Sequence, residues 1–95
     1  MKDQERNDIL KTSWDIHGLV ERSYLAMDVK KDDPEWPEKQ RLLLADMALH
    51  LLQTALAPGE LPTDKLKNNI HAVLTISDQF LPEAGLKAAT DKIYD

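Results

Sequence analysis

The sequence predicts an all-α protein, a small four-helix bundle-like domain. Apolar residues recur at three- and four-residue spacing in four segments, and no segment alternates apolar and polar residues as a half-buried strand does. The chain has 95 residues, and a second hydrophobic core is improbable below about 100 residues. We therefore expect a single helical domain over residues 1–95, with helices at about 3–27, 37–57, 63–81 and 83–94.

The first expected helix, residues 3–27, carries one apolar stripe along its length. Three acidic residues lie in its early turns, where carboxylates suit the helix dipole. His17 lies beside the stripe, and we interpret it as a partly buried, hydrogen-bonded side chain. The stripe predicts that one side of this helix packs on the rest of the chain; its members are Ile9, Ser13, Ile16, Val20, Tyr24 and Met27.

Two prolines mark the entry to the second helix, because proline belongs in a first helical turn. Either Asp33 caps a helix that begins at Pro34, or the helix begins at Pro37. Trp36 lies between these prolines. We expect its ring to fold back as a lid on the core, with a partner-binding anchor as the alternative, since tryptophan is enriched among interface hot spots.

The second expected helix, residues 37–57, is apolar around most of its circumference. Its one narrow polar strip contains Lys39, Asp46, His50 and Gln53. A helix of this kind must be surrounded, and so short a chain supplies few helices to surround it. This excess of apolar surface predicts self-association or a partner protein.

The faces of this helix have different expected roles. Opposite the polar strip, the side chains expected to face the core of the subunit are Leu44, Ala48, Leu52 and Ala55. Of the two flanks, one packs within the subunit and the other against a second chain. The candidate homodimer interface is the flank made by Leu43, Met47 and Leu51, with Trp36 as a further contact, and the alternative is the flank made by Leu42, Leu49 and Leu56.

The third and fourth expected helices are ordinary amphipathic segments. The third begins near Thr63 and keeps a solvated face opposite its apolar one. Pro82 ends or bends it. The last segment is too short to be stable by itself and must dock on a neighbour.

Charge and composition exclude several classes of function. The net charge is −5 and basic residues form no patch, so nucleic-acid binding lacks its usual driving force. The chain has no cysteine, and its apolar run is too short for a membrane span, which favours a cytoplasmic protein without membrane contact. One acidic cluster is a candidate contact surface for a basic partner, and it contains Asp32, Asp33, Glu35 and Glu38.

No residue pattern indicates catalysis or a bound cofactor. The serines lie inside expected helices without a sharp glycine turn, and the glycines are isolated from one another. Only Asp46 and His50 have the i, i+4 spacing of a metal-ligand pair. We interpret this pair as a solvent-facing polar contact and expect no catalytic, cofactor-binding or metal-binding residues.

The combined prediction is a non-enzymatic protein–protein interaction module, a small helical adaptor or regulator that acts as a homodimer. One alternative is an acidic inhibitor or immunity-type protein that uses the four clustered carboxylates to block a basic enzyme surface. A second alternative is a helical ligand- or metal-binding module built on Asp46 and His50.

Overall fold

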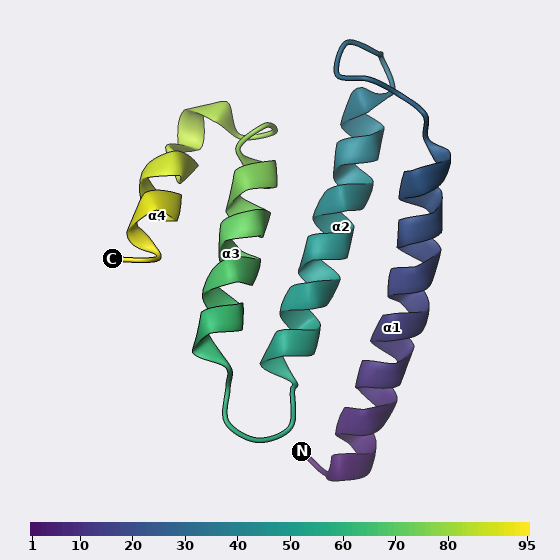
Figure 1. Cartoon of the computed structure of the whole chain (residues 1–95), viewed down its shortest axis with the longest axis vertical. Coiled ribbons are helices and arrows are strands. Elements are labelled where there is room, and N and C mark those ends of the chain that lie inside the picture. The colour runs from purple at the N-terminus through teal and green to yellow at the C-terminus, as the bar shows by residue number, and fades with distance from the viewer.

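The computed structural model describes all 95 residues and contains four α-helices and no strand (Figure 1). The all-α class is confirmed, and the four helices are consistent with a small bundle. The elements are α1 (Asp3–Ala26), α2 (Trp36–Ala55), α3 (Thr63–Ser77), the 3₁₀ turn η1 (Pro82–Ala84) and α4 (Leu86–Lys92).

Prolines and one glycine set the boundaries near the C-terminus. α3 ends at Ser77, four residues before the expected position 81, because Leu81 precedes Pro82 and adopts a non-helical conformation with φ −131°. Gly85 then has φ +65° and separates η1 from α4. Earlier in the chain, α2 begins at Trp36 with Pro37 in its first turn.

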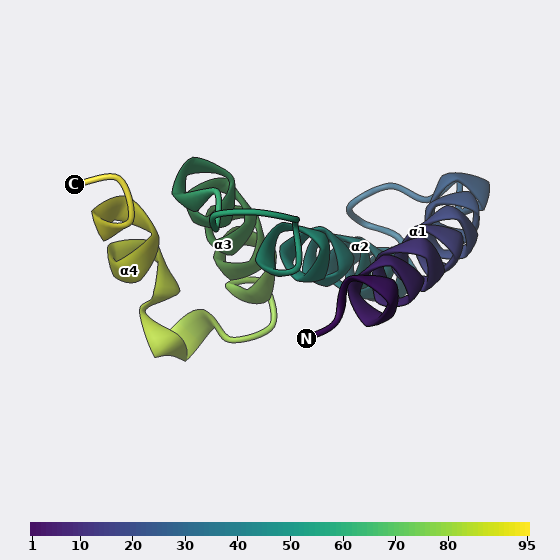
Figure 2. The same ribbon diagram turned by 90° about the horizontal axis from the view of Figure 1, so that it is seen from below.

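The helices lie side by side in a single layer. Extensive packing joins consecutive helices, α1 to α2, α2 to α3 and α3 to α4, and the view along the layer shows them in a row (Figure 2). The Cα extents are 46 × 35 × 16 Å, and the radius of gyration is 15.1 Å. A compact chain of this length has a radius of gyration of about 12 Å. The molecule is therefore flat and extended.

This flat arrangement leaves almost no hydrophobic core. Five of 95 residues are buried, and Ile76 is the one hydrophobic residue among them. The expectation that the face of α2 opposite its polar strip points into the core is wrong: Ala48, Leu52 and Ala55 are exposed, and Leu44 is half-buried. The reason is that α2 is covered on its two flanks, by α1 and by α3, and nothing in the chain covers the face between them.

Polar side chains occupy the most buried positions between helices. Ser13 accepts a hydrogen bond from Gln53 Nε2 across the α1–α2 seam at 3.3 Å. Across the α2–α3 seam, Gln79 Nε2 donates to Gln40 Oε1 at 3.0 Å. A third cross-helix hydrogen bond joins the Thr54 hydroxyl to Asn69 Oδ1. Because buried polar groups need partners, these bonds fix how the helices align with one another.

α4 docks on α3, as expected for a helix too short to be stable by itself. The Tyr94 hydroxyl donates to Asn68 Oδ1 at 2.7 Å, and the Tyr94 ring lies 5.6 Å from the ring of His71. Thr90 is buried between the two helices and donates to Leu86 O. None of the helices combines the length and hydropathy that crossing a bilayer requires.

Candidate functional site

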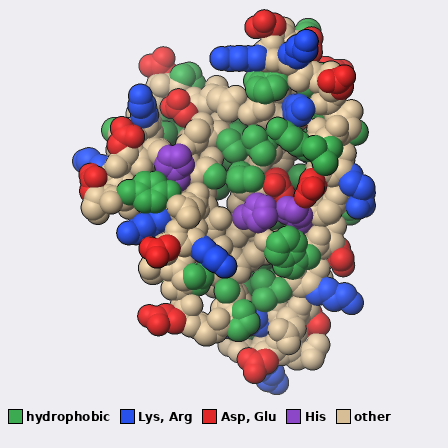
Figure 3. Space-filling view, viewed as in Figure 1, with side chains coloured by type: hydrophobic (Ala, Val, Ile, Leu, Met, Phe, Trp, Pro, Cys, Tyr) green, Lys and Arg blue, Asp and Glu red, His purple; other side chains and the backbone are tan.

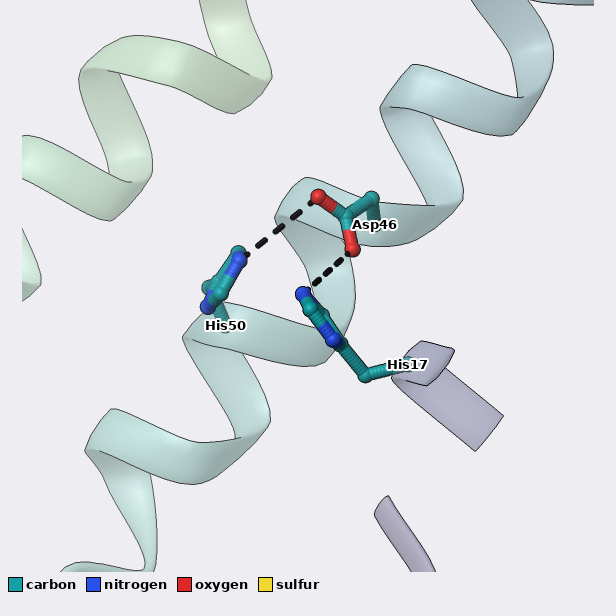
Figure 4. A group of neighbouring side chains, drawn as sticks. All are labelled: His17, Asp46 and His50. Atoms are coloured by element: carbon teal, nitrogen blue, oxygen red, sulfur yellow. Dashed lines mark ion pairs between the residues drawn. The ribbon is translucent and has the colours of Figure 1, made fainter. Parts of the chain in front are cut away.

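Two histidines and one aspartate meet near the centre of one broad face of the layer. Figure 3 shows this face: the histidine and carboxylate groups lie in the middle, hydrophobic side chains gather around them, and most charged side chains lie toward the rim. Asp46 and His50 stand one turn apart on α2, and His17 reaches across from α1 (Figure 4). A cluster drawn from two helices depends on how α1 and α2 align.

Both imidazole rings approach the same carboxylate. His17 Nε2 lies 3.0 Å from Asp46 Oδ1, and His50 Nε2 lies 3.6 Å from Asp46 Oδ2. The two rings are 4.8 Å apart between centroids and meet edge to face. One nitrogen or oxygen from each of the three residues lies within 4.8 Å of the others. The three side chains thus present their donor atoms to one small volume.

The carboxylate is the least satisfied polar group of the cluster. The side chains of His17 and Asp46 are only 14% and 16% exposed, and that of His50 is 33% exposed. Asp46 Oδ1 is fully buried and makes no hydrogen bond, because the nearby His17 nitrogen lies close without the alignment of a donor. Buried polar atoms without a partner are uncommon in folded proteins.

Two neighbours hold the rings in place. Trp14 packs edge to face against His17 at 5.2 Å and against His50 at 6.2 Å between ring centroids. Glu21 Oε2 lies 3.6 Å from Nδ1 of His17, one helical turn further along α1. The Glu21 contact is too long for a hydrogen bond, so the two nitrogens of His17 face carboxylates at unequal distances, 3.6 Å to Glu21 and 3.0 Å to Asp46.

A groove opens beside the cluster on the same face. It measures about 500 Å³, and its lining includes Leu10, Trp14, His50 and Gln53, together with residues of the α2–α3 connection. His50 and Trp14 therefore belong both to the cluster and to the wall of the groove. A small molecule or a water in the groove can reach the imidazole of His50 directly.

The opposite face of the α1–α2 pair is apolar and open. Leu52 follows His50 by two residues, which turns its side chain about 200° around α2 and onto the far face. Ile9, Ile16 and Leu52 are 37%, 43% and 36% exposed, and they line a second groove of about 310 Å³ between α1 and α2. The three exposed alanines of α2, Ala45, Ala48 and Ala55, lie on this same side. We call this surface, with Leu19, the apolar face.

The flank expected to form the dimer interface lies against α3. Leu43, Met47 and Leu51 are half-buried and follow one stripe of α2. The stripe runs between Thr54, which hydrogen-bonds Asn69 of α3, and Gln40, which hydrogen-bonds Gln79 just after α3. Trp36 is half-buried at the first residue of α2. The open surface of α2 is thus a different one, around Ala48 and Leu52.

The acidic cluster lies at the α1–α2 connection. Asp32, Asp33 and Glu35 are exposed in the loop, and Glu38 is exposed in the first turn of α2. Two of the four have partners within the chain: Asp33 Oδ2 accepts a hydrogen bond from the Lys30 amide at 2.7 Å, and Glu38 pairs with Arg41 at 3.2 Å. These contacts fold the loop and helix start, and no observation favours the inhibitor hypothesis.

The sequence pattern places two of the three cluster residues together but not the third. Asp46 and His50 share a helix face at i, i+4, which spacing alone indicates. His17 joins them across a helix seam, and the distance from His17 to Asp46 depends on packing rather than on local spacing. The one sequence feature that could have indicated His17 as a member of the cluster is its position beside an otherwise apolar stripe.

Comparison with known proteins gives no relative: no protein-family model, no curated protein and no solved structure matches the chain.

Proposed function

We propose that this protein is a non-enzymatic helical interaction module that works as a homodimer through its apolar face. One observation carries the proposal: in a chain of 95 residues, Ile76 is the one buried hydrophobic residue. Stable domains are normally built from two packed layers around a hydrophobic core. A single layer of amphipathic helices needs a second layer, and a second copy of the chain can supply it.

The exposed area is consistent with one missing partner. The chain exposes 6840 Å² at a mass of 10.8 kDa, whereas a compact monomer of that mass exposes about 5,500 Å². The excess of roughly 1,300 Å² is more than the ~800 Å² that each partner contributes to a standard interface.

The composition of the apolar face suits self-association. A two-fold interface brings the same surface from both copies together, so the patch must be complementary to itself. Leucine and isoleucine side chains on one helix pair can interdigitate with alanines on the other, and Ala48 and Ala55 permit close helix approach. Two α1–α2 pairs facing each other would make a four-helix arrangement with its core at the interface.

The proposal includes a regulatory or adaptor role in the cytoplasm, in which dimerisation completes the fold that a further protein recognises. The absence of cysteine is compatible with a reducing compartment.

The test is the solution mass by light scattering across a dilution series, with two Leu→Glu variants. Leu52→Glu places a charge on the apolar face and is expected to shift the chain to monomer. Leu25→Glu is the matched control, because Leu25 is 68% exposed and lies nine residues from Ile16, about 180° around α1. It should leave the dimer intact.

Two results would overturn the proposal. The natural chain could be monomeric at every concentration, or both variants could dissociate it equally. We expect the natural chain to be a dimer that Leu52→Glu dissociates and Leu25→Glu does not.

A further inference from the structure

We propose that His17, Asp46 and His50 form a binding site for one Zn²⁺ ion per chain. The site lies on the face opposite the apolar face, so it is independent of the proposed dimer contact. Two imidazoles and one carboxylate are the donor set of three-ligand zinc sites, in which a fourth position stays open to water or another ligand. Both histidines and the aspartate come from one chain.

The donor atoms have nearly the spacing that one ion requires. With bonds of about 2.0–2.1 Å, two ligand atoms of a tetrahedral zinc site stand roughly 3.3 Å apart. His17 Nε2 lies 3.0 Å from Asp46 Oδ1 and His50 Nε2 lies 3.6 Å from Asp46 Oδ2, and one donor atom from each residue lies within 4.8 Å of the others. To reach one ion, the three donors must close from separations of up to 4.8 Å to about 3.3 Å, and we propose that side-chain rotation supplies this change.

The unpartnered carboxylate oxygen is the second observation. Asp46 Oδ1 is buried and makes no hydrogen bond, although an imidazole nitrogen lies close to it. Leaving such an atom without a partner costs free energy in the folded state. A cation between the carboxylate and the two imidazole nitrogens satisfies it, because all three groups then act as electron-pair donors.

The surroundings of His17 also resemble those of a metal ligand. Histidine ligands commonly donate their second N–H to a carboxylate, which orients the ring and raises its basicity. Glu21 Oε2 lies on the Nδ1 side of His17 at 3.6 Å, so a small movement of this exposed side chain would make that hydrogen bond. Trp14 packs against both rings and restricts their rotation.

The donor set also selects the class of ion. Magnesium and calcium prefer oxygen donors, whereas imidazole nitrogen suits zinc and its neighbours in the first transition row. The groove beside His50, which Leu10 and Gln53 also line, gives the open position access to solvent or to a small ligand. The site therefore fits Zn²⁺ and not Mg²⁺ or Ca²⁺.

Calorimetric titration of the chelator-treated protein with Zn²⁺ tests the site. The natural chain is expected to bind one Zn²⁺ and to show no binding of Mg²⁺. His17→Gln and His50→Gln should each weaken binding by more than about tenfold, and Glu21→Gln by about tenfold, as for residues that orient a ligand. His71→Gln is the matched control, because His71 lies on α3 against Tyr94 and should leave the affinity unchanged.

A second readout does not depend on variants of the ligands. The chain has two tryptophans; Trp14 touches the cluster, whereas Trp36 lies ten residues from Asp46 along α2, about 15 Å away. Co²⁺ should quench the fluorescence of Trp36→Phe, which retains Trp14, more strongly than that of Trp14→Phe. The visible absorption bands of nitrogen-ligated Co²⁺ should reach their maximum at the same Co²⁺ concentration as the quenching does.

The proposal fails if the natural chain binds no Zn²⁺, or if His71→Gln weakens binding as much as His17→Gln does. Equal quenching of the two tryptophans would likewise place the ion elsewhere.

Discussion

The two sides of the α1–α2 pair differ in what they leave unsatisfied. On one side, a buried carboxylate oxygen lacks a hydrogen bond although two imidazoles surround it. On the other side, Ile16 and Leu52 are open to solvent. The same two helices thus carry an incomplete polar site and an incomplete hydrophobic core. We propose that the two faces are completed differently, one by an ion and the other by a protein surface.

The seam between the helices explains how both sides remain open. Polar contacts join the ends of the α1–α2 pair: the Arg6 guanidinium donates to the Leu56 carbonyl at 2.7 Å, and the Lys39 ammonium donates to the Met27 carbonyl at 2.8 Å. Such bonds align two helices but contribute only about 0.5–1.5 kcal/mol each. Apolar side chains along the pair, such as Ile16, Leu49 and Leu52, line an open groove between the helices and are not fully buried.

The largest expected effect comes from comparing two isoleucines. Ile76→Ala removes the one buried hydrophobic side chain and should lower the free energy of unfolding of the dilute chain by about 2–4 kcal/mol. Ile16→Ala, at an exposed position of the apolar face, should cost the dilute chain less than about 0.5 kcal/mol. Urea denaturation followed by circular dichroism measures both.

Protein concentration sharpens this comparison. At concentrations where the natural chain is dimeric, the cost of Ile16→Ala should rise, because the side chain is then buried in the interface. A cost that does not change with concentration would contradict the role of Ile16 in association.

An intermediate effect is expected at the polar side. Asp46→Asn removes the charge of the carboxylate whose buried Oδ1 has no hydrogen bond. In metal-free protein we expect a change between zero and a stabilisation of about 1 kcal/mol, because a buried unpaired charge is unfavourable. The same variant should lose the rise in melting temperature that Zn²⁺ gives the natural chain. Strong destabilisation of the metal-free variant would mean that the carboxylate is already satisfied by its two histidines.

A substitution of small expected effect provides a baseline that touches neither side. Gly18 lies inside α1, and an added Cβ would meet only the end of the Arg22 side chain, at an ordinary 3.5 Å. Gly18→Ala should therefore raise the free energy of unfolding by about 0.5–1 kcal/mol through helix propensity alone. Neither the solution mass nor the Zn²⁺ affinity should change. A shift in either would show that α1 geometry couples to both sides.

Local periodicity was sufficient for the helical class and for the pairing of Asp46 with His50. Both follow from the 3.6-residue repeat, which depends only on neighbouring residues. The apolar circumference of α2 was likewise visible in the sequence, and with it the expectation of a partner. These features are properties of single helices, so no tertiary information was needed.

Only the tertiary structure decided which side of α2 stays open and which residue completes the polar cluster. Leu43 and Met47 were expected at an interface with a second chain but lie on the flank toward α3, whereas Leu52 was expected in the core but is exposed. His17 meets Asp46 because of how α1 and α2 align. Helix spacing specifies the directions in which side chains leave a helix, but the choice of neighbour on each side depends on contacts between residues far apart in the chain.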